Sequence, residues 1–219
     1  MYACISPPWF FKYDILFGFL FTLACFLIAG FSYNVYTKIK QKNVLCLSVG
    51  FLFMGFAYLS QALINTYFFL NLGKGLCANF QLQHITFLSS LSLTLHLIFM
   101  LIGLSFLTYT TLKSREPKIL YILLGASVIS LLLSRDLFHT FFILSALYFA
   151  LITWHFVDNY LKNRQPKTLL TALAFFVLTL GWIEFIFINY SPFFYVLGRV
   201  LELGAFLLIL WNYALVRKR

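Results

Sequence analysis

The segment YTKIKQKNVL, residues 36–45, decides how this chain is organised. It is a short basic stretch between two long apolar runs, and a similar stretch, YLKNRQPKTL, occurs at 160–169. When the sequence is shifted by 124 residues without gaps, 13 positions of 17–69 are identical. The matches include Tyr36 with Tyr160, Lys38 with Lys162, Gln41 with Gln165, Leu45 with Leu169, Phe51 with Phe175, Asn65 with Asn189 and Phe69 with Phe193. Self-similarity at a fixed shift indicates an internal repeat.

The apolar runs on either side of these stretches are long enough to cross a membrane. Apolar residues make up 62% of the chain and charged residues 10%, whereas a soluble domain carries about a quarter charged residues. A span needs about 20 apolar residues to cross about 30 Å of hydrocarbon. We therefore predict an all-α, polytopic membrane protein with seven transmembrane helices. Their predicted positions are near 14–36, 43–69, 85–111, 118–134, 138–161, 168–190 and 193–215.

The basic residues predict the direction of the spans. Twelve of the 16 Lys and Arg residues lie in alternate loops or at the C-terminus, all on one predicted side. By the positive-inside rule, the N-terminus is outside and the C-terminus is cytoplasmic, in the plasma membrane of the cell. The formal charge of +10 is thereby explained by topology, and we expect the lipid bilayer rather than nucleic acid as the partner.

The repeat and the spans together predict a 3+1+3 architecture within one domain, 1–219. Repeat A covers about 14–112, a linker helix covers about 118–134, and repeat B covers about 138–215. The linker helix lets both repeats run the same way through the membrane, as parallel repeats do in some transporters.

This topology is shared with the SWEET sugar transporters and the microbial rhodopsins. The spans lack the proline-glutamine signature of the former and the mid-span retinal lysine of the latter. The segments SPPWFFKYD (6–14) and LGRVLELGAFLLIL (197–210) resemble uncharacterised prokaryotic, archaeal-type seven-helix membrane proteins and the seven-helix input regions of sensor kinases. This resemblance implies a sensor-like role. Because only Arg-Lys-Arg follows the last span, we expect such a role to need a separate membrane or cytoplasmic protein partner.

Three ionisable residues lie inside the last two predicted spans: Glu184, Arg199 and Glu202. At 1.5 Å per residue, they lie roughly 9, 9 and 14 Å below the outer ends of their helices. Charged groups inside spans are costly and are candidates for function. We predict that Glu184, Arg199 and Glu202 share one layer of the outer leaflet.

Other polar residues can reach this layer. Gln61 and Asn65 lie near the outer end of the second span, Asn189 is the repeat mate of Asn65, and His96 lies near mid-membrane in the third span. We predict a polar ligand or ion pocket between the second, third, sixth and seventh helices. Three alternatives stay open: a structural lock in which Arg199 ties helices together, a ligand or ion site, and a proton relay.

Four further residues are candidates for special roles. His155 and Asp158 form an inner polar pair, interpreted either as a surface ion pair that includes Lys162 or as an inner gate. Cys4 and Cys77 could form a disulfide if the outer side is oxidising. No set of side chains has the number or spacing of metal ligands, and we expect no metal and no cofactor.

Two classes of function follow. The first is a non-enzymatic, receptor-like or sensor-like module that binds a small ligand in the outer half and acts through a partner. The second is a small transporter or proton-coupled carrier built from the two repeats. We find no Ser-His-Asp spacing or metal-ligand set and therefore expect no enzyme.

Overall fold

The computed structural model describes residues 7, 9–72, 82–112 and 116–217. Within these ranges the chain forms seven α-helices and no strand. In chain order they are α1 (Phe11–Ile39), α2 (Lys42–Leu72), α3 (Leu82–Thr111), α4 (Pro117–Leu132), α5 (Leu137–Asn163), α6 (Pro166–Ile186) and α7 (Pro192–Arg217). The prediction of an all-α fold is confirmed.

Six of these helices, all but α4, are long and apolar enough to cross a membrane over the described ranges. This is the makeup of a multi-pass membrane protein. Helix α4 is apolar but has 16 residues, and at 1.5 Å per residue it reaches only about 24 Å of the roughly 30 Å of hydrocarbon. The fourth predicted span, near 118–134, is therefore the one that falls short of the membrane thickness.

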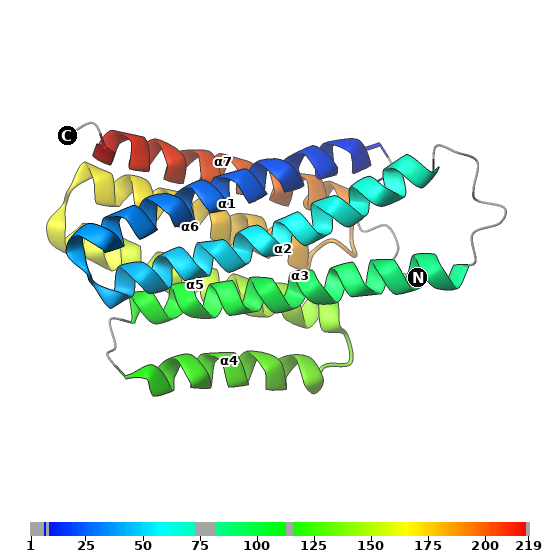
Figure 1. Ribbon diagram of the computed structural model, residues 1–219, viewed down its shortest axis with the longest axis horizontal. Coiled ribbons are helices and arrows are strands. Elements are labelled where there is room, and N and C mark those ends of the chain that lie inside the picture. Colours follow the sequence, from blue (N-terminus) through cyan, green and yellow to red (C-terminus); the bar gives the residue numbers. More distant parts are fainter. Residues whose placement is uncertain (1–6, 8, 73–81, 113–115, 218–219) are drawn as a thin grey trace.

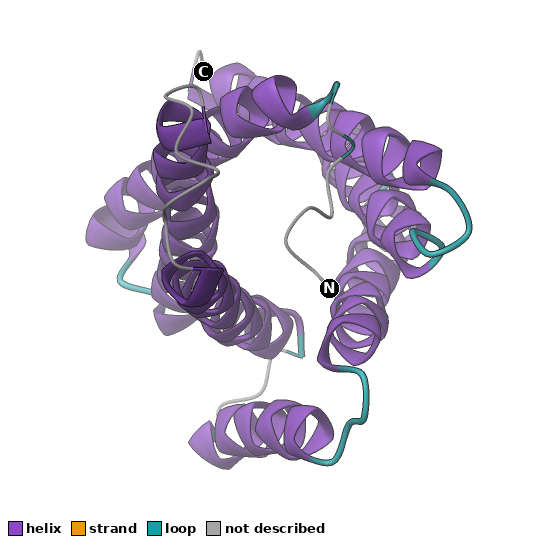
Figure 2. Cartoon of the chain, turned by 90° about the vertical axis from the view of Figure 1, so that its right-hand side faces the viewer, coloured by secondary structure: helices purple, strands orange, loops and turns teal. Residues whose placement is uncertain are grey.

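The six long helices form a closed ring (Figure 2), and α4 lies outside it. Helix α1 packs against α2 and α2 against α3; α5 packs against α6 and α6 against α7. Two seams close the ring, one between α1 and α7 and the other between α3 and α5. Helix α4 contacts only α3 and α5 among the described elements, and it runs alongside them in Figure 1.

The interior of the ring is filled mainly by aromatic and aliphatic side chains. Phe21, Tyr58 and Phe206 are fully buried and pack on one another, with ring centroids 5.2–6.0 Å apart. Large apolar side chains such as Leu23 and Trp154 point outward and are exposed. Apolar surface on both sides of a helix is typical of a membrane span, because its outer face meets lipid.

Glycines bring two pairs of helices into close backbone contact. A Cβ atom added to Gly103 of α3 would lie 2.8 Å from the carbonyl oxygen of Gly50 in α2. A Cβ atom added to Gly198 of α7 would lie 2.9 Å from the carbonyl oxygen of Gly181 in α6. Small residues at such crossings let helices in membranes approach closely.

The two similar basic stretches, 36–45 and 160–169, contain the ends of helices α1 and α5, which terminate in the same way. Lys40 and Arg164 have positive φ angles of 54° and 48°, and both are left-handed C-caps. Each donates its backbone N–H to a tyrosine carbonyl oxygen 2.7 Å away, on Tyr36 and Tyr160 respectively. Non-glycine residues seldom adopt this conformation, so the shared cap is a specific local similarity.

Candidate functional site

Arg199 is the centre of a buried polar cluster near the end of the bundle at which α1 and α7 begin. The residue is 6% exposed. Its Nε lies 3.1 Å from Asp14 Oδ1, its Nη1 lies 3.1 Å from Glu202 Oε2, and its Nη2 donates to Gln61 Oε1 at 3.3 Å. The guanidinium group therefore joins α7 to both α1 and α2.

Asp14 belongs to the first turn of α1 and is buried. Its Oδ1 accepts a hydrogen bond of 2.7 Å from Tyr195 Oη, and its Oδ2 accepts one of 3.4 Å from Asn65 Nδ2. Arg199 Nε also donates to Tyr195 Oη at 3.2 Å. These bonds close the seam between α1 and α7 with charged and polar groups.

Glu202 is fully buried one turn further along α7. Its Oε1 accepts a hydrogen bond from Tyr58 of α2, and its Oε2 binds Arg199. A carboxylate with a partner on each oxygen is well satisfied in a medium where an unpaired charge is very costly. The cluster thus has two acids to one base among the described residues.

Aromatic rings surround the guanidinium group. Arg199 Cζ lies 5.7 Å from the ring centroids of Phe21 and Phe185, and 5.3 Å from that of Tyr195. Cation–π contacts of this kind are strongest where water is excluded. They hold the positive charge in place inside an otherwise apolar bundle.

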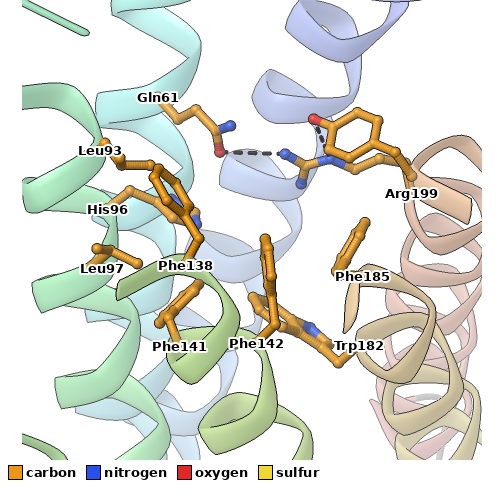
Figure 3. Close-up of a pocket in the computed structure, with 11 residues that line it drawn as sticks. Gln61, Leu93, His96, Leu97, Phe138, Phe141, Phe142, Trp182, Phe185 and Arg199 are labelled. Atoms are coloured by element: carbon orange, nitrogen blue, oxygen red, sulfur yellow. Dashed lines mark hydrogen bonds between the residues drawn. The ribbon is translucent and has the colours of Figure 1, made fainter. Parts of the chain in front are cut away.

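A cavity of about 40 Å³ lies beside the cluster. Its lining comes from five helices and consists of Gln61, Leu93, His96, Leu97, Phe138, Phe141, Phe142, Trp182, Phe185, Tyr195 and Arg199. Figure 3 shows Gln61 and Arg199 facing each other above the aromatic side chains of Phe142 and Trp182. One wall of the cavity is therefore polar and the other is aromatic.

Of the residues predicted to line a polar pocket, the structure brings Gln61, Asn65, Arg199 and Glu202 together in one hydrogen-bonded cluster. His96 lines the cavity, and its Nδ1 lies 3.0 Å from the carbonyl oxygen of Ala57. Because a carbonyl oxygen only accepts, this nitrogen carries the proton.

Two predicted members lie apart from the cluster. Glu184 forms no ion pair with Arg199; within the described residues, the carboxylates paired with Arg199 are those of Asp14 and Glu202. The expected span extended to residue 190, but α6 ends at Ile186. Glu184 is consequently in the last turn rather than two turns deep. Asn189 lies beyond the helix end and is exposed, unlike Asn65, which lies 124 residues before it in the sequence.

The other predicted groups lie elsewhere. Asp158 binds Lys162 at 2.6 Å, with both side chains largely exposed, which is the geometry of a surface ion pair. His155, on the same helix, has its ring 5.6 Å from that of Phe156. Cys4 and Cys77 lie outside the described residues. Over the described ranges, no group of three or more potential metal ligands comes together.

Three members of the cluster were not predicted from the sequence: Asp14, Tyr58 and Tyr195. Asp14 was the first residue of a predicted span, and no role was assigned to it. A signal was present, because Asp14 shares a helical face with Gly18, Thr22 and Ser32, a stripe of small and polar residues that faces the bundle interior. The tyrosines carried no comparable signal in a chain so rich in aromatic residues.

Comparisons with protein-family models, with curated proteins and with solved structures gave no match. The class of the protein therefore rests on its own features: an all-helical, multi-pass membrane protein with a buried Asp-Arg-Glu cluster beside a cavity.

The two glutamates near Arg199 in sequence are expected to differ in their effect on stability. Glu202→Gln removes a charge that binds Arg199 and Tyr58 in the core, so the free energy of unfolding should fall by about 1.5–3 kcal/mol. Glu184→Gln is the matched control and should change it by less than about 0.5 kcal/mol. Unfolding in mixed detergent micelles measures both. Equal losses would contradict the assignment of Glu202, rather than Glu184, to the cluster.

Proposed function

We propose that this chain is a receptor-like membrane module that binds a small molecule in the cavity and acts through a protein partner. The observation that carries the proposal is the cavity itself, which has Arg199, Gln61 and His96 on its lining together with five Phe and Trp side chains. Binding sites for small molecules combine mostly apolar walls with a few placed polar groups.

A purely structural lock explains less of this geometry. A lock needs one carboxylate for one guanidinium group, whereas this cluster has two. A lock also needs no open space, yet Arg199 and Gln61 both border the cavity. Both features favour a site that receives a further group.

The proposal includes the 3+1+3 arrangement of parallel repeats. Six of the seven buried positions of α5 lie 124 residues after a buried position of α1: 145, 146, 148, 149, 152 and 153 follow 21, 22, 24, 25, 28 and 29. The matching C-caps at Lys40 and Arg164 support the same register. The contacts are also symmetric, since exchanging α1–α3 with α5–α7 maps one seam of the ring onto the other.

The proposal further places the N-terminus outside the cell and the C-terminus in the cytoplasm. The uneven distribution of Lys and Arg between the two sides supports this orientation. The cluster then lies in the outer half of the membrane. A partner protein would detect ligand binding by contacting either the membrane-facing surfaces of the helices or the cytoplasmic side of the chain.

The test is to purify the chain in lipid nanodiscs, to dialyse it to equilibrium against a small-molecule extract of its native cells, and to identify by mass spectrometry the molecules that are enriched with the protein. We expect a molecule that is retained by the wild type and lost from His96→Phe, which fills the cavity from the α3 side. Glu184→Gln, outside the cavity lining, is the control and should retain it. The same bound mass in all three proteins, or none in the wild type, would contradict the proposal.

The alternative is a small carrier, and a specific observation favours it. The hydroxyl oxygens of Ser105, Thr108 and Ser145 are buried and have no hydrogen-bond partner among the described residues. Ser105 and Thr108 are on the half of α3 away from the Arg199 cluster, where a path across the membrane would continue. Flux of small solutes or protons in proteoliposomes that exceeds empty vesicles and is lost on Ser105→Val would support the carrier.

A further inference from the structure

We propose that the ligand of this cavity is a small, uncharged molecule that carries a hydrogen-bond acceptor next to a donor, as a primary amide does. This inference rests on the proposed function, because it names the chemical class that the same cavity takes. It follows from the unused hydrogen-bonding groups at the cavity, the charge of the neighbouring cluster and the size of the space.

The unused donors call for an acceptor on the ligand. The Nε1–H of Trp182 is buried and has no partner in the described part of the chain. The side-chain nitrogen of Gln61 also has none there, since only its oxygen is engaged, by Arg199. A buried donor without a partner is costly. An acceptor such as a carbonyl oxygen, placed in the cavity, would give the buried Trp182 donor a partner.

His96, in contrast, offers an acceptor and so calls for a hydrogen-bond donor on the ligand. Its Nδ1 donates to the Ala57 carbonyl oxygen, so the neutral ring presents Nε2 as an acceptor. No described residue bonds to this second nitrogen. An N–H or O–H group adjacent to the ligand's acceptor would bind here. Donors and an acceptor on one cavity lining are the complement of an amide.

The charges near the cavity disfavour an ionised ligand. Arg199, the cationic group on the cavity lining, is already paired with the carboxyl groups of Asp14 and Glu202, so an anion would find no unpaired counter-charge. A cation would contact the lining next to Arg199 itself, since the guanidinium group borders the cavity and the two carboxylates do not. In a low-dielectric interior both arrangements are unfavourable.

The space limits the ligand to a few non-hydrogen atoms. The cavity volume is about 40 Å³, whereas one water needs about 10–15 Å³ and a benzene-binding cavity measures about 150 Å³ on the same scale. Phe141, Phe142 and Phe185 form apolar walls that suit a methyl group rather than a second polar group. A ligand of four such atoms binds with a Kd of about 40 µM or weaker.

The repeats explain why the two walls differ. At a shift of 124 residues, Tyr58 and Gln61 correspond to Trp182 and Phe185. Equivalent positions thus contribute polar side chains in α2 and aromatic ones in α6, and both α2 and α6 border the cavity. The asymmetry gives a small amphipathic ligand a single orientation.

The test uses three molecules of one shape and different charge: acetamide, acetate and acetamidinium. Each is titrated into the full chain in lipid nanodiscs, and binding is measured by saturation transfer from the protein to the methyl protons. We expect saturable binding of acetamide above empty nanodiscs. Acetate and acetamidinium should bind at least about ten-fold more weakly.

Two variants locate the site. Trp182→Phe keeps an aromatic ring but removes the unpaired Nε1–H donor. It should weaken acetamide binding about five-fold. Trp154→Phe, an exposed tryptophan on α5, is the matched control and should leave it unchanged. Thermal melting of both variants checks that each is folded.

Tighter binding of acetate or acetamidinium, an unchanged affinity in folded Trp182→Phe, or no saturable binding of acetamide would each overturn this inference. None of these results would overturn the proposed function, which fails only if the purified wild type carries no cavity-dependent molecule. Failure of this inference and failure of the proposed function are therefore distinguishable.

Discussion

Replacing Arg199 by Gln is expected to lower the free energy of unfolding by about 3–5 kcal/mol, because it leaves two carboxylates buried without a counter-charge. Asp14 and Glu202 both bind this guanidinium group directly. Their remaining donors, such as Tyr195, offset only part of the loss. Unfolding of the purified protein in mixed detergent micelles is the measurement.

The control for this prediction is Arg135→Gln, which removes the same charge from an exposed position between α4 and α5. Within the described residues Arg135 forms no ion pair, and its loss should cost less than about 0.5 kcal/mol. Adding Asp14→Asn to Arg199→Gln should recover part of the stability, since it removes one unpaired charge. A loss below about 1 kcal/mol for Arg199→Gln alone would show that the cluster does not carry the predicted charges.

The second large effect is expected at the crossing of α2 and α3. In Gly103→Ala the new Cβ would lie 2.8 Å from the Gly50 carbonyl oxygen and 3.1 Å from the Met54 backbone nitrogen. Backbone atoms cannot move aside without separating the helices, so we expect a loss of about 1–3 kcal/mol. Thermal melting in lipid nanodiscs measures it.

Gly30→Ala is the matched control, because a Cβ there meets nothing within 4 Å. Alanine favours a helix over glycine by up to about 1 kcal/mol in water, so this variant should be unchanged or slightly more stable. The two substitutions are chemically identical, and only Gly103→Ala is predicted to lower the stability. Equal effects would contradict the close approach of α2 and α3.

The sequence predicted the helices well because membrane spans depend on long, local apolar runs. Six of the seven predicted spans correspond to helices long enough to cross a membrane, with boundaries shifted by a few residues. The exception, α4, is apolar throughout but short. Apolar composition alone does not separate a full span from a helix at the side of the bundle, since both meet lipid or protein rather than water.

The site was harder to predict, because it depends on which faces of different helices meet. The pairing of Arg199 with Glu202 could be predicted from their i, i+3 spacing. The pairing of Arg199 with Asp14, which lies on a different helix, could not. Glu184 was chosen by depth, and an error of four residues in the end of α6 was enough to misplace it. Asp14 was overlooked because a charge at a span end usually faces water, whereas here Phe10 and Tyr195 pack nearby.

The most direct test of the account is an experimental density map of the wild-type chain in nanodiscs, at a resolution that shows ordered small molecules. We predict Arg199 bonded to Asp14 and Glu202, and non-protein density between Gln61, His96 and Trp182. A map in which these three side chains close over the cavity and leave no such density would contradict the claim that the cluster is part of a binding site.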